Sequence, residues 1–543
     1  MNWLRVNEDG EPVYTAEQLA RMFQMYQAYT DKEKQKHERI LDEEYRGKKR
    51  MQEDAESIQH REGAVISRVE PWAFAVDDYR LADYCSRCLV SKKTVPELKK
   101  CSSCSYLSYC GKTCQVADWT EHKVLCSLFK MREFFDRRAL VDTKILTLFL
   151  KVLAKLKLHV QKNANPSNGT TRVPPHLFFN IKINDALVSK DERLQKTYNN
   201  WLPFIKVADD NGAVCADLPT FCRIYGRMMV ALGPLHAKVC EHFDDTDSKR
   251  PCEIGLALPL SLATYQRSCM PNAAAVSSGG TQIAVKALKN IPNGEPITVG
   301  WSIDRFSTPD LREKQLRMRY LNCSCPGCTD PLVIERRNAV RCVNSKCEMA
   351  IPLDTRKASK CNHCKQMVST DRMLEADVIM LELTQLFTTL NDKPFGSRGL
   401  TADEFKQLHQ LYEKAKGLLH CTNLVLGMAN RELANHFRSI EQHTNSIRHL
   451  KRMILSAEIH LGKYDEIVMT AMMDMFTYYL AKRRFKEGLP ILEETRKRMS
   501  VIPGDDTDDY KAVDKLCRAM QKENADFFKY CKDMDWETIP AGK

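Results

Sequence analysis

Four pairs of metal-ligating side chains follow one another within a short stretch of the chain, with the spacings Cys-x2-Cys, Cys-x2-Cys, Cys-x3-Cys and His-x3-Cys. A closed structural zinc site takes four Cys or His ligands, so four pairs are enough for two sites. The members of the last pair are four residues apart and share one face of a helical turn. Pairs at ligand spacing favour zinc over a chance grouping of thiols. We therefore predict two Zn²⁺ ions held by Cys85, Cys88, Cys101, Cys104, Cys110, Cys114, His122 and Cys126.

A second cysteine set lies further along the chain. Cys323, Cys325 and Cys328 supply three ligands where a closed zinc site needs four. Cys269 is a candidate for the fourth ligand, but it lies more than 50 residues upstream. Spacing alone therefore leaves the fourth ligand open.

A third set consists of the pairs Cys342-x4-Cys347 and Cys361-x2-Cys364. Two pairs of thiols at this spacing are typical of a zinc ribbon, so we predict one more zinc ion here. The alternative is a pair of hairpins whose thiols have no ligand role. Because four cysteines complete the shell, we expect His363 to face solvent.

Length and composition indicate the number of domains and the cellular compartment of the protein. A chain of 543 residues with 43% hydrophobic residues is long enough for three or four domains of about 150 residues, each with an apolar core. It has no apolar run near the ~18 residues of a membrane span, and its first residues lack the apolar region of a secretory signal. We therefore expect an intracellular protein, in the nucleus, the cytoplasm or both, whose cysteines are thiols or metal ligands.

The net charge of +12 is a mild excess for this length. It favours acidic partners through nonspecific attraction. However, the sequence has no arginine-rich block and no basic stripe with interleaved aromatic residues, so a solvated basic surface is the favoured interpretation. We expect neither nucleic acid as the main partner nor a membrane.

The periodicity of apolar residues predicts several helical segments. Residues 1–62 form a charged helical extension in this interpretation, because Thr15 and Gln18 make a capping box ahead of an apolar stripe. Residues 127–250 and the chain from residue 370 onward also have mainly helical patterns.

Residues 252–301 have a different character, with short β runs separated by turns. Because no helix of crossover length lies between these runs, we predict a small sheet rather than a parallel α/β one. Residues 63–84 add a strand and a loop. In the helical C-terminal part, Thr401 and Glu404 are predicted to cap a helix, and the succession of helices is consistent with a TPR-like array.

The order of the first four ligand pairs resembles the MYND zinc finger, in which the first pair shares a zinc with the third and the second with the fourth. The chain as a whole resembles the SET and MYND domain (SMYD) family over about residues 63–510. The matching motifs are Glu253-Ile-Gly-Leu-Ala-Leu258 in a core strand, Ser268-Cys-Met-Pro-Asn272 at the end of NHSCxPN, Gly294-Glu-Pro-Ile-Thr-Val299 as GEELTI, and Arg312-x2-Gln315-Leu316-x3-Tyr320 before the cysteine triplet.

This resemblance implies an α+β fold: a small β-rich SET core interrupted by the MYND finger and a helical insert, then zinc-bound post-SET and ribbon segments and a C-terminal TPR-like helical domain. In the family the motif cysteine joins the post-SET triplet, which makes Cys269 the fourth ligand of that zinc. The implied domains are the extension (1–62), a SET strand segment (63–84), the finger (85–126), the insert (127–250), the SET core (251–305), the post-SET segment (306–332), the ribbon (333–370), the TPR-like domain (371–535) and a tail (536–543).

The family transfers a methyl group from S-adenosylmethionine to a lysine amine, which requires a bent cofactor and an oriented, neutral amine. Three positions depart from the family pattern. The glycine-rich loop expected before Gly63 is absent from residues 49–55, and Gln266 and Arg267 replace the Asn-His pair of NHSC. Trp301 replaces the channel tyrosine, and an indole donates one hydrogen bond and accepts none.

Tyr320 keeps the aromatic type that the family has before the post-SET cysteines, so it is a candidate catalytic residue, together with Trp301 at the tyrosine position. Gln266, Arg267 and Asn272 are the candidate cofactor-binding residues. Because the metal ligands are intact while these positions differ, the resemblance implies a retained scaffold with weak or lost methyl transfer, and it leaves S-adenosylmethionine binding in question. The alternative is an active protein-lysine methyltransferase with altered geometry.

Two classes of function follow from the sequence. As a binding protein, which is the favoured prediction, the chain would dock peptides on its finger, proline-rich ones in the family, and other proteins on a concave face of its C-terminal helices. As an enzyme, it would methylate a lysine of a histone or of another protein.

Overall fold

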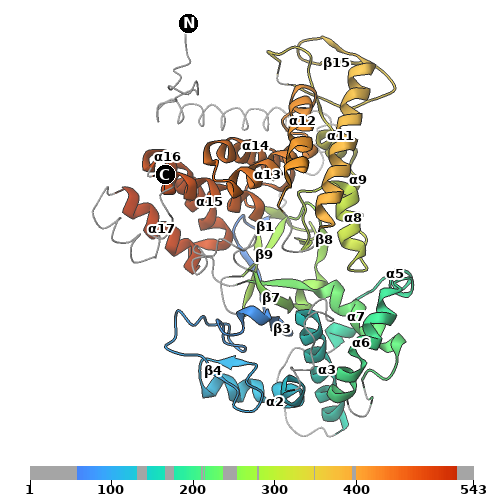
Figure 1. Ribbon diagram of the computed structural model, residues 1–543, viewed down its shortest axis with the longest axis vertical. Helices are drawn as coiled ribbons and strands as arrows, with labels where there is room; N and C mark the ends of the chain where they lie inside the picture. Colours follow the sequence, from blue (N-terminus) through green and yellow to red (C-terminus); the bar gives the residue numbers. More distant parts are fainter. Residues whose placement is uncertain are drawn as a thin grey trace.

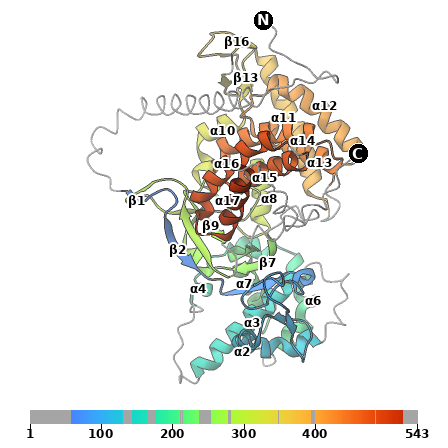
Figure 2. The same cartoon turned by 90° about the vertical axis from the view of Figure 1, so that its left-hand side faces the viewer.

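The computed structural model describes residues 58–521 except for 131–142, 165–175, 210–211, 213, 237–252, 278–280, 348, 394–398 and 483. The two largest sheets lie between the zinc finger with its adjoining helices at one end and the C-terminal helices at the other (Figure 1, Figure 2). The chain is a mixed helix and strand protein, as predicted. Within the described ranges, no helix combines the length and the apolar content needed to cross a membrane.

The largest sheet has five strands in the order β2-β10-β9-β12-β8. β10 pairs antiparallel with β2 and β9, whereas β12 runs parallel to both β8 and β9. Two of the β runs predicted within residues 252–301 are β10 and β12. The strand bounds are β2 (Val65–Val69), β8 (Gln266–Ser268), β9 (Ala273–Ser277), β10 (Ile283–Ala287) and β12 (Thr298–Gly300).

A second sheet has three antiparallel strands, β3 (Ala73–Val76), β7 (Glu253–Leu258) and β6 (Gly233–His236). All four residues of β3 are buried. At Gly255 an added Cβ would lie 2.1 Å from the carbonyl oxygen of Ala75. Only glycine therefore allows β7 to approach β3 this closely.

The strand β1 (Ile58–His60) corrects the prediction of helix over residues 1–62. It pairs antiparallel with β11 (Ile291–Pro292). Its partner lies in the second half of the chain, so the local pattern of charged residues gave no indication of this pairing. Residues 1–57, including the predicted capping box, lie outside the described residues.

The finger and the segment after it form one packed unit. The finger's hairpin leads into a long helix, and the helices that follow share a core with β3 and β7. The mainly helical prediction for residues 127–250 is confirmed where these are described, with β6 as the exception. The elements are η1 (Asp78–Arg80), β4 (Lys99–Lys100), β5 (Ser108–Tyr109), α2 (Lys112–Lys130), α3 (Thr143–Ala164), α4 (His176–Phe179), α5 (Asp185–Ser189), α6 (Arg193–Ala208) and α7 (Leu218–Ala231).

Short elements connect the strands to the C-terminal helices. Each of the three helices in this region has proline in its first turn, where a missing N–H costs nothing. Two hairpins follow. The elements are η4 (Leu260–Thr264), α8 (Pro309–Arg317), α9 (Pro326–Thr329), α10 (Pro331–Arg337), and the pairs β13 (Val340–Arg341) with β14 (Ala350–Ile351) and β15 (Ser359–Lys360) with β16 (Met367–Val368).

The C-terminal part is an array in which each helix packs on the next. The predicted capping box is confirmed: the side chain of Thr401 accepts from the backbone N–H of Glu404, whose carboxylate accepts from that of Thr401. The elements are α11 (Thr370–Asn391), α12 (Ala402–Leu418), α13 (Leu424–Ser439), α14 (His443–Leu461), α15 (Glu466–Ala481), α16 (Phe485–Met499), η5 (Ser500–Gly504) and α17 (Asp508–Gln521).

Ion pairs join this array of helices to the loop that follows β12 in the largest sheet. Arg305, in the loop after β12, pairs with Asp465, which is 6% exposed and caps α15 by accepting from the N–H of Ile467. The guanidinium of Arg431 lies 2.8 Å from the carboxylate of Asp304. Both contacts tie helices of the array to the loop that follows the largest sheet.

Candidate functional site

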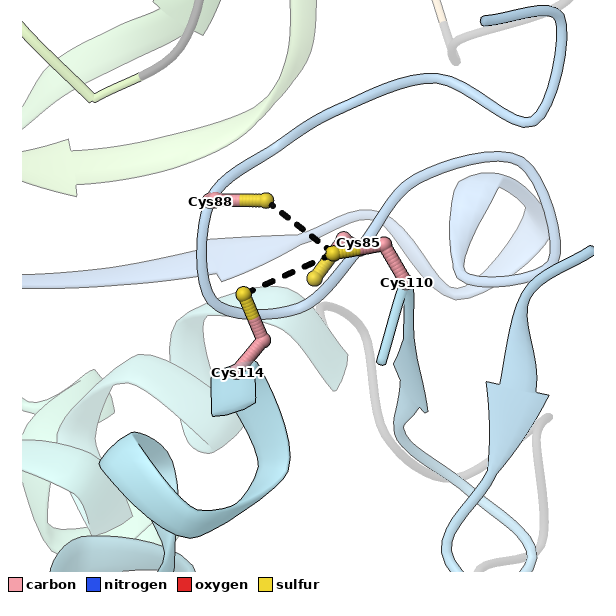
Figure 3. Close-up of side chains that lie close together, drawn as sticks. All are labelled: Cys85, Cys88, Cys110 and Cys114. Atoms are coloured by element: carbon pink, nitrogen blue, oxygen red, sulfur yellow. Dashed lines mark hydrogen bonds between the residues drawn. The ribbon is translucent and has the colours of Figure 1, made fainter. Parts of the chain in front are cut away.

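The first and third ligand pairs of the finger meet in one cluster, which we call the first finger cluster (Figure 3). Cys85 and Cys88 lie in the loop after η1, Cys110 follows β5, and Cys114 lies in the first turn of α2. The Sγ atoms of Cys88 and Cys110 are 3.6 Å apart, and those of Cys110 and Cys114 are 3.5 Å apart. This is the interleaved arrangement that the resemblance implied.

The second and fourth pairs form the second finger cluster, made of Cys101, Cys104, His122 and Cys126. The Nε2 atom of His122 lies 3.4 Å from the Sγ atom of Cys101 and 3.6 Å from that of Cys104. Burial lowers the pKa of His122, which favours the neutral imidazole that binds a metal. Helix α2 carries both members of the last pair, as their spacing predicted.

The third group, the triplet cluster, joins two distant segments. The Sγ atom of Cys269, at the end of β8, lies 3.8 Å from that of Cys323 and 3.6 Å from that of Cys328. The backbone N–H of Cys269 donates to the Sγ atom of Cys325 over 3.2 Å. The structure therefore brings together the four cysteines for which spacing alone left the fourth member open.

The fourth group, the hairpin cluster, lies between the two hairpins that precede α11. The Sγ atoms of Cys342 and Cys364 are 3.4 Å apart, and those of Cys347 and Cys361 are 3.7 Å apart. His363 is exposed, as expected, although its Nδ1 atom lies 3.6 Å from the Sγ atom of Cys347. The four thiols thus form a complete ligand set in which the imidazole of His363 is not needed.

The distances within all four groups fit a tetrahedral zinc ion. A Zn–S bond of about 2.3 Å gives a tetrahedron whose sulfur atoms are about 3.8 Å apart. A disulfide would bring two sulfur atoms to about 2.05 Å, and all sixteen residues have their ligand atoms within 4.8 Å of the others in their group instead. In donor type, number and spacing, the four clusters are therefore suited to zinc.

Three of the Cys-x2-Cys pairs share one backbone conformation. The residue directly after the second cysteine is left-handed, with φ values of 61° at Leu89, 53° at Ser105 and 61° at Lys365. In each case its N–H donates to the carbonyl oxygen of the pair's first cysteine, over 2.9, 2.8 and 3.0 Å respectively. Residues other than glycine rarely adopt this conformation, so the turn that aims two thiols at one point stores local strain.

Two predicted cofactor-binding residues lie on β8, which runs beside β12. The side chain of Gln266 is exposed. The guanidinium of Arg267 donates to the carbonyl oxygen of Gly300 over 3.0 Å and lies 5.9 Å from the ring centroid of Trp301. Burial, followed by the charge of Arg319, lowers the pKa of Arg267 to about 10. The arginine is therefore engaged by the end of β12 and by the ring beside it.

The side chain of Asn272 holds two segments of the same sheet together. Its amide NH₂ donates to Glu295 over 2.9 Å and to the carbonyl oxygen of Pro296 over 3.0 Å. Its carbonyl oxygen accepts from the N–H of Thr298 over 2.7 Å. The residue is 4% exposed, so its polar atoms serve the contact between the turn before β9 and the approach to β12.

The two predicted channel residues also have partners within the protein. The indole N–H of Trp301 donates to the Sγ atom of Cys323 over 3.2 Å, which connects the channel position to the triplet cluster. Tyr320, with φ 59° and 3% exposure, donates its hydroxyl to the carboxylate of Asp191 over 2.8 Å. Two hydrogen bonds of 2.8 Å from Arg193 hold that carboxylate in place.

Electrostatics keeps the Tyr320 phenol neutral. Burial, followed by the hydrogen bond and the negative charge of Asp191, raises the pKa of Tyr320 far above its usual value. The hydrogen bond from Arg193 lowers the pKa of Asp191, so the acceptor stays ionised. The Tyr320 hydroxyl therefore keeps its proton and donates it in a hydrogen bond to Asp191, between α5 and α6.

A buried arginine, Arg337, lies beside the triplet cluster, and a second one, Arg312, acts on it. Arg337 is 4% exposed and donates to the carbonyl oxygen of Gly327, which lies between two of the cluster's cysteines. Burial and the charge of Arg312 lower the pKa of Arg337 to about 10, while the thiolates of the cluster act in the opposite direction. Arg312 is 2% exposed. A zinc ion with four thiolates carries a net negative charge, so the guanidinium of Arg337 suits it as a counter-charge.

Residues 84–126 match the MYND finger family. The chain is similar to the histone-lysine N-methyltransferase SMYD3 of Mus musculus (25% identical over 49% of this chain and 56% of that protein) and to the histone-lysine N-methyltransferase ASHR1 of Arabidopsis thaliana (25%, over 58% and 62%). It is also similar to the N-lysine methyltransferase SMYD2-A of Xenopus laevis (24%, over 51% and 58%). The finger match and these relatives support membership of the SET and MYND domain family. The chain spans a little more than half the length of the curated relatives that it matches.

The sequence left three residues around the site unrecognised. Asp191 gave no signal, because it lies 129 residues from the tyrosine that it binds. Arg337 had no motif around it. Arg312 was noted only as part of the motif before the cysteine triplet, and its effect on Arg337 had no signal in the sequence.

Proposed function

We propose that this chain is a zinc-stabilised protein-interaction module built on the lysine-methyltransferase architecture of its family, with weak or lost methyl transfer. One observation carries the proposal. The four metal clusters are complete, whereas Arg267, Asn272, Trp301 and Tyr320 are each engaged by partners within the protein. A residue whose polar atoms are already bonded must break those bonds before it can hold a cofactor or orient an amine.

The proposal includes the layout and the ligand sets expected from the sequence. Residues 63–84 and 251–305 would form the SET core, with the finger and the insert between them. The two sheets support this layout, because β3 of the first segment pairs with β7 of the second, and β2 pairs with β10. The packing of α11 to α17 supports a TPR-like domain. Each cluster would hold one structural Zn²⁺.

The finger is the proposed docking site for peptides, proline-rich ones included. Val116 is 62% exposed and Trp119 is 43% exposed, both on α2. An exposed aromatic ring on a rigid helix suits an extended proline-rich segment, which stacks on such rings without losing much conformational entropy. The protein would act inside the cell, where thiols remain available to zinc.

The second candidate is an active S-adenosylmethionine-dependent methyltransferase that acts on a lysine of a histone or another protein. The names of the similar proteins SMYD3, ASHR1 and SMYD2-A, all lysine methyltransferases, favour it. In this reading Tyr320 would exchange Asp191 for the substrate amine, and Gln266, Arg267 and Asn272 would contact the cofactor.

Calorimetric titration of the zinc-loaded full chain with S-adenosylmethionine separates the two candidates. We expect no binding heat at millimolar cofactor and no radiolabel transfer to a peptide array that includes histone peptides. Micromolar binding together with transfer would refute the proposed loss of activity. The double variant Gln266→Asn with Trp301→Tyr tests the cause, since gained cofactor binding would identify these two positions as the ones responsible.

A further inference from the structure

One face of α11 exposes three large apolar side chains in helical register. Leu374, Val378 and Leu381 are 47%, 53% and 58% exposed. Their spacing of four and three residues places them in one stripe along the helix. The opposite side of the same helix packs into the core of the C-terminal array, through buried residues such as Ile379 and Leu383. Helix α11 is therefore apolar on two faces, although the protein covers only one.

Carboxylates flank this stripe. At 100° per residue, Asp371, Glu375 and Glu382 lie on one side of it and Asp377 on the other. All four are exposed, and none forms an ion pair with another residue in the part of the chain that the structure describes. Asp371 is favoured by its place in the first turn of the helix. The other three have no such local reason.

A hollow of about 1040 Å³ between α11 and α12 extends the stripe. Glu382 and Gln385 of α11 line it on one side. On the other side it is lined by polar residues of α12, including Gln407 and Gln410. Helix α11 lies beside α12 (Figure 1). Because Glu382 lines the hollow and directly follows the exposed Leu381, the stripe and the hollow adjoin on the surface of the protein.

We propose that this surface, the α11 face, binds a basic amphipathic helix of a partner protein. Apolar side chains at such spacing receive the apolar stripe of a second helix, and the flanking carboxylates pair with lysine or arginine beside that stripe. A second copy of this chain fits less well, because a symmetric contact between two α11 faces would bring identical carboxylates together. The apolar stripe predicted after Thr15 and Gln18 is flanked by Glu17 and Arg21, whose charges cancel, so it offers no net positive charge to the carboxylates.

The α11 face is distinct from the finger and from the channel residues. If no helix binds the α11 face, the proposed loss of methyl transfer and the proposed peptide docking on the finger are unaffected. A contact of one helix with this face is small, so we expect a transient complex with a micromolar dissociation constant.

Fluorescence anisotropy with the zinc-loaded full chain tests the proposal. The probe is a labelled synthetic helix of 18 residues with leucine in one stripe and lysine on both flanks. The matched controls are the same peptide with glutamate for lysine, and a scrambled peptide of equal composition. We expect only the first peptide to bind, and to bind less tightly as the salt concentration rises, because exposed charges are screened.

Variants of the protein locate the contact. Val378→Ser with Leu381→Ser should weaken binding about tenfold or more, and Glu375→Lys with Asp377→Lys should do the same. Ile440→Ser is the matched control, since Ile440 is 47% exposed at the end of α13. Equal loss in this control, equal binding of the scrambled peptide, or no binding at all would overturn the proposal. So would a dimer of the wild-type chain that Val378→Ser dissociates.

Discussion

Replacing Cys269 by serine tests the role of the triplet cluster as a cross-link. The Sγ atom of Cys269 faces cysteines that are 54 and 59 residues further along the chain. The chain-entropy relation for a cross-linked loop of this length gives about 4 kcal/mol of stabilisation. A zinc ion that joins these segments restricts the unfolded chain in the same way. We therefore expect Cys269→Ser to lower the free energy of unfolding by about 4 kcal/mol when zinc is bound.

Urea unfolding followed by circular dichroism measures this difference, with and without a chelator. In the chelated protein the cross-link is absent from both chains, so the variant and the wild type should then unfold at similar urea concentrations. Native mass spectrometry should count one zinc ion fewer in the variant. Cys222→Ser is the control, because Cys222 lies in α7 outside the four clusters. A loss no larger than that of the control, or an unchanged zinc count, would refute the cross-link.

Three further variants test other parts of the argument. Arg305→Met should cost about 3–5 kcal/mol, because it leaves the buried carboxylate of Asp465 uncompensated. Burial raises the pKa of Asp465 and Arg305 opposes that rise, so removal of Arg305 raises this pKa further. The difference between variant and wild type in urea unfolding should therefore grow as the pH rises above the folded-state pKa of the wild-type Asp465, and a pH-independent difference would contradict this. Ser105→Gly should raise the stability of the chelated protein by about 0.5–1 kcal/mol, since glycine relieves the left-handed strain at an exposed position; a lower melting temperature would count against that strain. Gly255→Ala should cost at least about 2–3 kcal/mol, because its Cβ would meet the carbonyl oxygen of Ala75, and an unchanged urea midpoint would show that the strands separate freely.

Local spacing predicted the parts of the site whose members are close in sequence. The second finger cluster follows from pairs whose members lie three or four residues apart, and the capping box of Thr401 and Glu404 follows from a spacing of three. The interleaving of the pairs, by contrast, came from the family resemblance. Spacing cannot supply it, because any two pairs would complete a tetrahedron.

Contacts between segments that are distant in the chain could not be predicted from the sequence. The strand at residues 58–60 was predicted as helix because its pattern of charges is local while its partner, Ile291, is remote. The hydroxyl of Tyr320 has a partner 129 residues away, and the indole of Trp301 has one 22 residues away. Nothing in the spacing of these residues indicates such pairs, so the engaged state of the channel positions could be seen only in three dimensions.

The surroundings of the triplet cluster have a consequence for sulfur reactivity. Its thiolates accept N–H groups from Cys269 and Trp301 and lie close to the guanidinium of Arg337. Donors and positive charge draw electron density away from sulfur, and a thiolate so engaged is a weaker nucleophile. In the hairpin cluster, no arginine is among the main causes of the pKa shifts of Cys342, Cys347 and Cys364. Oxidants and alkylating agents should therefore release metal from the hairpin cluster before the triplet cluster, so that the two hairpins come apart while the cross-link between β8 and the triplet is still in place.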